Sequence, residues 1–282
     1  SYAYFSRDLP SVSALRDYKP QQTTRVYDRH KKVIGEIFAE RRTVIPMSKV
    51  PRHMVLSVLA AEAADFSEHE GLDYNGILRA VGRDIGAGRA AQGGSTITQQ
   101  VVKLMLLTPE RTLSRKVREL ILARRLENEL SKDEILHLYL NHVNFGRGRY
   151  GIQEAARYYF AKNASELTLA ESAMLAGVPQ APARLSPRRN PEAAKRRQDY
   201  VLSQLEAKRE VYWPDLSEEA IAAAREEKVE LAPLPEGAGK APEVLSIARH
   251  ALRAAVGDEA LGEGGYEVHT TIDLSLQKQA RE

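Results

Sequence analysis

Apolar residues recur every three or four positions through most of the stretch from residue 51 to 209, which is the spacing of amphipathic helices. A carboxylate on an apolar helix face loses hydration, which raises its pKa toward the range in which a general acid or base works. Glu62 is such a residue if residues 54–66 form a helix, because its face also carries Val55, Val58, Leu59 and Phe66. The alternative is a helix that ends near Ala64 and leaves Glu62 pointing to solvent.

A glycine-rich stretch precedes the next predicted helix. The glycines between Gly86 and Gly94 predict a flexible loop, and Ser95 or Thr96 is a suitable cap for the helix that follows. The free amides at such a helix start bind phosphate. The segment that begins at Gly88 starts like a P-loop, but Gly94 occupies the lysine position, which excludes nucleotide binding through a Walker motif.

The polar face of this helix carries no acid and is formed by Thr96, Gln99, Gln100 and Lys103. Hydroxyl, amide and ammonium groups together suit a sugar diphosphate, whereas a merely solvated face usually mixes both signs of charge. An ordinary amphipathic helix is the alternative.

A second candidate carboxylate lies on the helix predicted over residues 114–130. Glu119 follows Arg115 by four residues and Lys116 by three, so both cations lie on its side of the helix. Their charges favour the ionised carboxylate, and Glu62 and Glu119 would then favour opposite protonation states, as in divided acid and base roles. Two alternatives remain. The cations hold a phosphate while Glu119 orients them or a metal ion, or the three residues form ordinary surface ion pairs.

The remaining segments predict a small sheet and further helices. Residues 231–242, rich in Pro and Gly, are typical of a linker. The other expected elements are a hairpin of strands over residues 25–27 and 32–38, a helix capped by Ser114, helices over residues 217–227 and 244–256, a strand over residues 266–273 and a helix from residue 274.

Composition narrows the class of protein. The 282 residues can bury one sizeable core plus an appendage, and the formal charge of +3 is too small to imply nucleic acid. The chain has no cysteine, which excludes disulfides and thiolate metal sites. It also has no His-Glu-x-x-His motif, and no apolar run reaches the ~18 residues of a membrane span.

Five ordered motifs between residue 51 and about residue 205 carry a resemblance to a known family. The first consists of Glu62, Phe66, His69 and Gly71, and the second, Gly-Gly-Ser-Thr-Ile-Thr-Gln-Gln, runs from Gly93 to Gln100 with Lys103 after it. The third consists of Arg115, Lys116, Glu119, Ala123, Leu126 and Glu127. The fourth consists of Lys132, Ile135, Leu136, Tyr139, Leu140, Asn141, Gly146, Gly151, Ala155 and Ala156, and the fifth of Arg197, Val201 and Leu202. Together they closely resemble the peptidoglycan glycosyltransferase domain of class A penicillin-binding proteins (glycosyltransferase family 51).

The resemblance implies a mainly α, lysozyme-like domain with a small N-terminal β-hairpin and a C-terminal linker segment. It also implies an inverting enzyme that polymerises lipid II into β-1,4 glycan strands and releases polyprenyl diphosphate. Glu62 would deprotonate the acceptor's 4-hydroxyl, and Glu119 would be the second catalytic carboxylate. The implied substrate-binding residues are Phe66, His69, Ser95, Thr96, Gln99, Gln100, Lys103, Arg115 and Lys116. His69 has the alternative role of fixing a turn by a hydrogen bond.

Other expectations follow from the same resemblance. A divalent cation, Mg²⁺ or Mn²⁺, would bind Glu119 together with the diphosphate, and no organic cofactor is implied. The expected partners are lipid II, the nascent glycan strand, the membrane surface and cell-wall assembly proteins. The expected location is the periplasmic face of the bacterial cytoplasmic membrane, with an anchoring N-terminal helix trimmed from this chain. Apolar and arginine residues between Tyr74 and Leu107 suit shallow membrane insertion, with an ordinary core as the alternative.

The expected domain division is residues 1–48, 49–209 and 210–282. The last segment resembles the linker toward a transpeptidase domain, whose set of Ser-x-x-Lys, Ser-x-Asn and Lys-Thr-Gly motifs is not found here.

One departure from the family leaves alternatives open. Ala63 stands where the family has an aspartate, so a non-catalytic lipid II-binding or scaffold domain is the first alternative. A lytic enzyme of the lysozyme type is the second, although such an enzyme does not need the diphosphate-binding set of residues.

Overall fold

Most of the described chain forms a helical body. The computed structural model describes residues 9–15, 21–37, 41–62, 95–107, 112–234 and 242–279. The predicted mainly α fold is confirmed. The helices of the body are α2 (Arg52–Glu62), α4 (Ile97–Met105), α5 (Leu113–Glu129), α6 (Lys132–His142), α7 (Ile152–Phe160), α8 (Leu169–Gly177), α9 (Pro191–Tyr212) and α10 (Glu218–Glu226), with 3₁₀ turns η1 (Ser13–Leu15), η2 (Met47–Lys49) and η3 (Ala164–Glu166).

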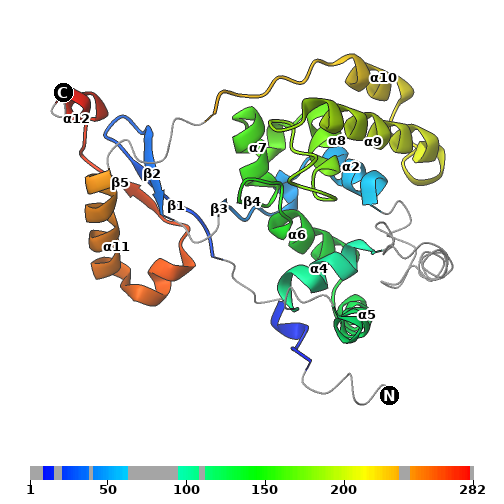
Figure 1. Ribbon diagram of the computed structural model, residues 1–282, viewed down its shortest axis with the longest axis horizontal. Helices are drawn as coiled ribbons and strands as arrows, with labels where there is room; N and C mark the ends of the chain where they lie inside the picture. Colours follow the sequence, from blue (N-terminus) through cyan, green and yellow to red (C-terminus); the bar gives the residue numbers. More distant parts are fainter. Residues whose placement is uncertain are drawn as a thin grey trace.

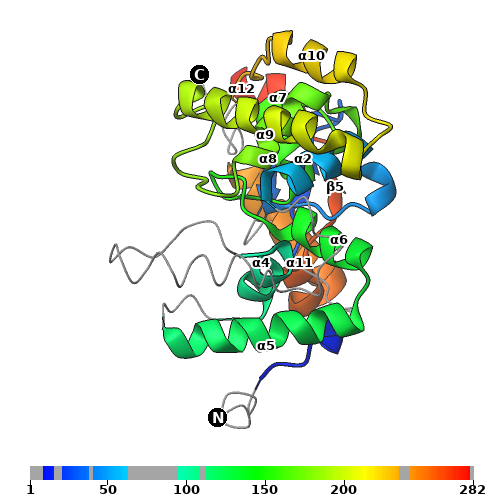
Figure 2. The same cartoon turned by 90° about the vertical axis from the view of Figure 1, so that its right-hand side faces the viewer.

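The body contains two groups of packed helices. Helices α2, α8 and α9 pack on one another, while α4 packs on both α5 and α6. In two perpendicular views α4 lies between α5 below it and α6 above it (Figures 1 and 2). One apolar core runs through all of them, and its largest fully buried side chains include Tyr139, Tyr159 and Phe145. This arrangement brings the C-terminal end of α2 close to α4.

A small sheet stands apart from the body, with α11 packed against it (Figure 1). Strands β1 (Thr24–Tyr27) and β2 (Val33–Ile37) form the predicted antiparallel hairpin. Strand β5 (Glu267–His269) then pairs in parallel with β1, which gives the order β2-β1-β5. Helix α11 (Pro242–Glu263) covers the sheet, and α12 (Leu274–Gln279) follows β5. The two ends of the chain therefore share one sheet, a pairing that no local sequence pattern could predict.

Two glycines let the chain turn from α11 into β5. Gly264 and Gly265 have φ values of 71° and 82°, in the left-handed region that favours glycine. A Cβ atom on Gly264 would lie 2.0 Å from the carbonyl oxygen of Gln22. The close approach of these two backbone segments therefore requires glycine at this position.

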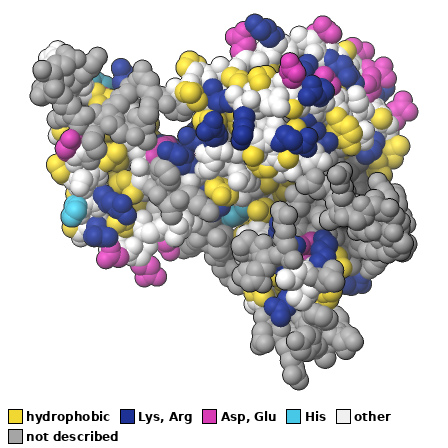
Figure 3. Space-filling model, viewed as in Figure 1, with side chains coloured by type: hydrophobic (Ala, Val, Ile, Leu, Met, Phe, Trp, Pro, Cys, Tyr) yellow, Lys and Arg dark blue, Asp and Glu magenta, His cyan; other side chains and the backbone are white. Residues whose placement is uncertain are grey.

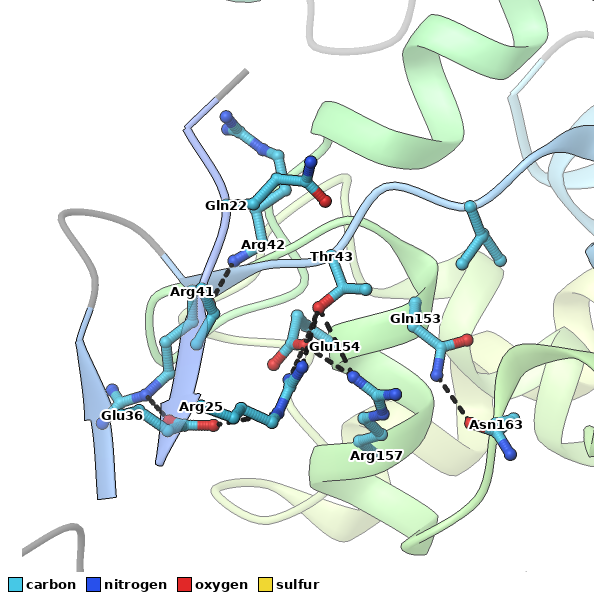
Figure 4. Close-up of polar contacts among 12 residues, drawn as sticks. Gln22, Arg25, Glu36, Arg41, Arg42, Thr43, Gln153, Glu154, Arg157 and Asn163 are labelled. Atoms are coloured by element: carbon cyan, nitrogen blue, oxygen red, sulfur yellow. Dashed lines mark hydrogen bonds and ion pairs between the residues drawn. The ribbon is translucent and has the colours of Figure 1, made fainter. Parts of the chain in front are cut away.

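A buried carboxylate joins the sheet to the body. Glu154 of α7 accepts a hydrogen bond from Thr43 Oγ1 at 2.6 Å and pairs with Arg157 at 3.3 Å and with Arg25 of β1 (Figure 4). Burial acts to raise the pKa of Glu154, but Arg25, the hydrogen bonds and Arg157 outweigh it and lower that pKa. Many other Lys and Arg side chains lie on the face of the body seen in Figure 3.

The segment that leads from the sheet into α2 is fixed by a second set of contacts. It starts at β3 (Arg41–Arg42), which pairs in parallel with β4 (Arg149–Tyr150). Further along, the backbone N–H of Ile45 donates to Asn141 Oδ1 at 2.9 Å, and Asn141 Nδ2 donates to the Ile45 carbonyl at 3.0 Å. These contacts hold the segment that leads into α2, the helix that carries Glu62.

Several element boundaries differ from the sequence prediction. Thr112, rather than Ser114, caps α5, because its side chain accepts from the N–H of Arg115 at 3.1 Å. Helix α11 extends beyond the predicted residues 244–256 and bends at Gly257, whose φ is 86°. Helix α10 has the predicted cap at Ser217. The division into three domains stays a prediction.

Candidate active site

Glu62 is the last described residue of α2, and its carboxylate is turned toward the protein. Gln100 Nε2 donates to Glu62 Oε2 at 2.6 Å. Oε1 is buried, with no hydrogen-bond partner in the described part of the chain. Burial raises the pKa of Glu62, while the bond from Gln100 and the charge of Arg197 oppose the rise. The interpretation of Glu62 as a desolvated carboxylate is therefore supported over one in which it points to solvent.

Helix α4 supplies adjacent side chains to two different neighbours. Thr96 caps it by accepting from the N–H of Gln99 at 3.2 Å, as one of the two predicted caps. Gln100 reaches Glu62, while Gln99 Oε1 accepts from Lys116 Nζ at 3.2 Å. Neighbouring helix residues point about 100° apart, so α4 contacts both candidate carboxylate sites through consecutive residues.

Glu119 lies at the centre of a cationic cluster on α5. Arg115 Nη1 donates to Glu119 Oε2 at 2.8 Å, and Lys116 Nζ donates to Oε1. Glu119 is only 2% exposed, so the alternative of ordinary surface ion pairs does not hold for it. Lys116 also donates to Ser95 Oγ at 3.2 Å and remains 40% exposed. The cluster therefore offers a reachable cation beside the start of α4.

The other predicted residues have mixed outcomes. Lys103 is exposed and makes no ion pair or hydrogen bond within the described ranges, so it lies free at the surface of α4. Phe66, His69 and Ala63 lie outside the described residues. The stretch predicted to enter the membrane is described only at its end, where residues 105–107 pack against the core.

Two residues near Glu62 had no predicted role. Arg197 of α9 donates to the carbonyl oxygen of Ala61 at 3.1 Å and acts electrostatically on Glu62. Its place in the fifth motif was a signal that could have singled it out. Tyr139 of α6 is fully buried, and the Glu62 carboxylate acts on its hydroxyl. Its place in the fourth motif was the corresponding signal.

The residues around Glu119 do not fit a resident divalent cation. Both of its oxygens already accept from cationic side chains, so a Mg²⁺ ion bound through this carboxylate would have to displace Arg115 or Lys116. Within the described ranges, no group of three or more His, Cys, Asp or Glu side chains is arranged to hold a metal ion. The expected divalent cation stays a prediction, and no step of the reaction below depends on it.

The part of the chain that carries the cluster and the desolvated glutamate matches a known family. A sequence model described as "Transglycosylase" matches residues 30–206. The chain belongs to the transglycosylase family. The predicted family and enzyme class are thereby confirmed, and membership supports glycan polymerisation as the activity of the family.

Relatives of this transglycosylase carry the name penicillin-binding protein 1A. The protein of that name from Pseudomonas aeruginosa is 38% identical over 99% of this chain and 34% of its own length. Its namesake from Rickettsia conorii is 46% identical over 72% of this chain and 26% of its own length. The transglycosylase chain therefore spans about a third or less of these curated relatives.

A solved structure supports the fold of the transglycosylase. The crystal structure of penicillin-binding protein 1A from Haemophilus influenzae matches with a TM-score of 0.52 and 23% identity, over 94% of this chain and 29% of that chain. The likeness agrees with the mainly α architecture. No helix among the described residues is long and apolar enough to cross a bilayer.

Proposed function

We propose that this chain polymerises lipid II into β-1,4 glycan strands by an inverting reaction. Glu62 takes the proton from the acceptor's 4-hydroxyl. The freed oxygen forms a bond to the donor's anomeric carbon while the bond from that carbon to the diphosphate oxygen breaks. The electron pair of the broken bond leaves with the polyprenyl diphosphate, and the configuration at carbon changes from α to β.

The observation that carries this proposal is the pair of contacts made by Gln99 and Gln100. Through them one helix connects the carboxylate of Glu62 with the cations around Glu119. A base whose pKa is raised by burial is a stronger proton acceptor near neutral pH. Cations arranged in advance stabilise charge that develops on a leaving group. A base and a diphosphate site, reached by consecutive side chains of one helix start, are the two groups that this transfer needs.

Each half of the site has a separate part in the reaction. Ser95, Thr96 and the amides of the α4 start would orient the diphosphate, and Lys116 and Arg115 would stabilise its charge as it leaves. Glu119 would hold those two cations in place rather than exchange a proton. This assignment favours glycosyl transfer over glycan cleavage, since cleavage of a preformed strand releases no diphosphate.

The membrane surface would be the place of the reaction. Lipid II carries a polyprenyl tail, so the domain must reach the bilayer from its periplasmic side. The arginines predicted for this contact and Ile85 lie outside the described residues, whereas Met105, Leu106 and Leu107 of the same prediction pack against the core. Ile85→Asp is expected to remove binding to anionic vesicles with folding intact, as measured by vesicle sedimentation at low salt. No binding by the unchanged chain would contradict the membrane contact.

A non-catalytic lipid II-binding domain is the second candidate, because Ala63 replaces the aspartate expected beside the base. If the chain is catalytic, Ala63→Asp should raise turnover with little change in melting temperature, because it restores a carboxylate beside the base. Equal turnover would mean that Ala63 is a tolerated residue.

An assay with labelled lipid II tests the function itself. We expect polymer from the purified chain, with β-linked sugars by NMR of the product. Binding without polymer, in both the unchanged chain and Ala63→Asp, would support the scaffold instead. Cleavage of preformed glycan without polymerisation would support the lytic enzyme.

A further inference from the structure

Two buried polar atoms in the core lack partners and have complementary chemistry. Within the described part of the chain, neither the Tyr139 hydroxyl nor Glu62 Oε1 has a hydrogen-bond partner. Buried tyrosine hydroxyls usually find a partner, and an unsatisfied buried polar group destabilises the fold. The first atom can donate a hydrogen bond and the second can accept one.

The fold brings both groups against α4, because Gln100 of α4 donates to Glu62 and α4 packs on α6, which carries Tyr139. Burial raises the pKa of the Tyr139 hydroxyl well above its usual value, and the Glu62 carboxylate adds to the rise. The hydroxyl therefore stays protonated and remains a donor. The other polar groups that act on Glu62 are Gln100 of α4, which satisfies Oε2, and Arg197 of α9. Tyr139 of α6 is a third polar residue beside Gln100 and Arg197.

We propose that Tyr139 is a positioning residue for the base: its hydroxyl donates toward Glu62 Oε1 through one ordered water and stabilises the ionised carboxylate. Such a bridge satisfies both orphaned atoms. It also fixes the carboxylate from two sides, because Gln100 holds one oxygen and Tyr139 holds the other. The inference rests on the proposed function, since it assigns Tyr139 to the base of that reaction.

The test is a titration of the Glu62 carboxyl group by infrared difference spectroscopy against Glu62→Gln, which needs no substrate. Loss of a donor to the ionised form raises the pKa of a carboxyl group. Tyr139→Phe should therefore move the titration up by about 0.5–1 pH unit. The acid limb of the polymerisation rate should move in the same direction. A 3-fluorotyrosine at position 139 donates more strongly in nearly the same shape and should move the titration down.

Tyr159→Phe is the matched control. Tyr159 is also fully buried, but its hydroxyl donates to the Phe145 carbonyl at 2.9 Å. Its loss should lower the melting temperature and leave the Glu62 titration unchanged. An unmoved titration in both Tyr139 variants, or an equal shift in Tyr159→Phe, would overturn the inference. Absence of polymer from the unchanged chain would instead overturn the proposed function, because the spectroscopic titration does not depend on activity.

Discussion

At the scale of single residues, Glu62 combines a functional role with a cost to stability. Its pKa is raised above the ordinary value of 4.5, chiefly by burial. The folded state therefore holds this proton more tightly than the unfolded state does. The resulting stabilisation is complete below pH 4.5 and is lost as the pH rises through the raised pKa. At neutral pH the buried, ionised carboxylate therefore destabilises the folded state.

Replacement of this carboxylate by a neutral amide should remove that destabilisation. Glu62→Gln is expected to melt above the unchanged chain at pH 7.5, by about 2–4 °C for each kcal/mol recovered. The difference should shrink toward pH 4, where Glu62 becomes protonated. Glu210→Gln, at a side chain 84% exposed, is the control and should change little. An equal difference at both pH values would contradict the desolvation of Glu62.

At the scale of elements, the first turn of α5 presents the cations to the site. Thr112→Ala removes the cap and should destabilise the protein by about 1 kcal/mol. Because Arg115 and Lys116 lie in that turn, polymerisation should also slow. Ser114→Ala should have the smaller effect on both, as measured by thermal unfolding and initial rates. The reverse order would mean that Ser114 is the true cap.

Helix positions could be predicted from sequence, whereas the choice between neighbouring caps could not. The three- to four-residue spacing was enough for α2, α4 and α5, because each buries one apolar face. Thr112 and Ser114 are both good caps two residues apart, and only the observed backbone selects Thr112. The burial of Glu119 could not be predicted from sequence either, since it depends on how α4 packs on α5. Arg197 reaches Ala61 across a sequence separation of 136 residues, which no local pattern encodes.

At the scale of the whole molecule, pairing of β1 with β5 joins segments from near the two ends of the chain in one sheet. Gly264→Ala places a Cβ against Gln22 and forces a left-handed φ on alanine, so it should destabilise the sheet by at least about 1 kcal/mol. Gly262→Ala is the matched control, because a Cβ there meets nothing within 4 Å. It should be neutral or slightly stabilising. Hydrogen exchange at β1 and β5 measures the effect, and equal protection in both variants would contradict the shared sheet.

The central claim is that Glu62 is the base of a glycosyl transfer whose leaving diphosphate is held by the α5 cations. The most direct measurement compares the rate of lipid II polymerisation and the affinity for lipid II in the unchanged chain and in Glu62→Gln. The account predicts a rate at least about 100-fold lower with affinity largely retained, because Glu62 acts on the acceptor proton while other residues hold the diphosphate. Near-normal turnover of Glu62→Gln would contradict it.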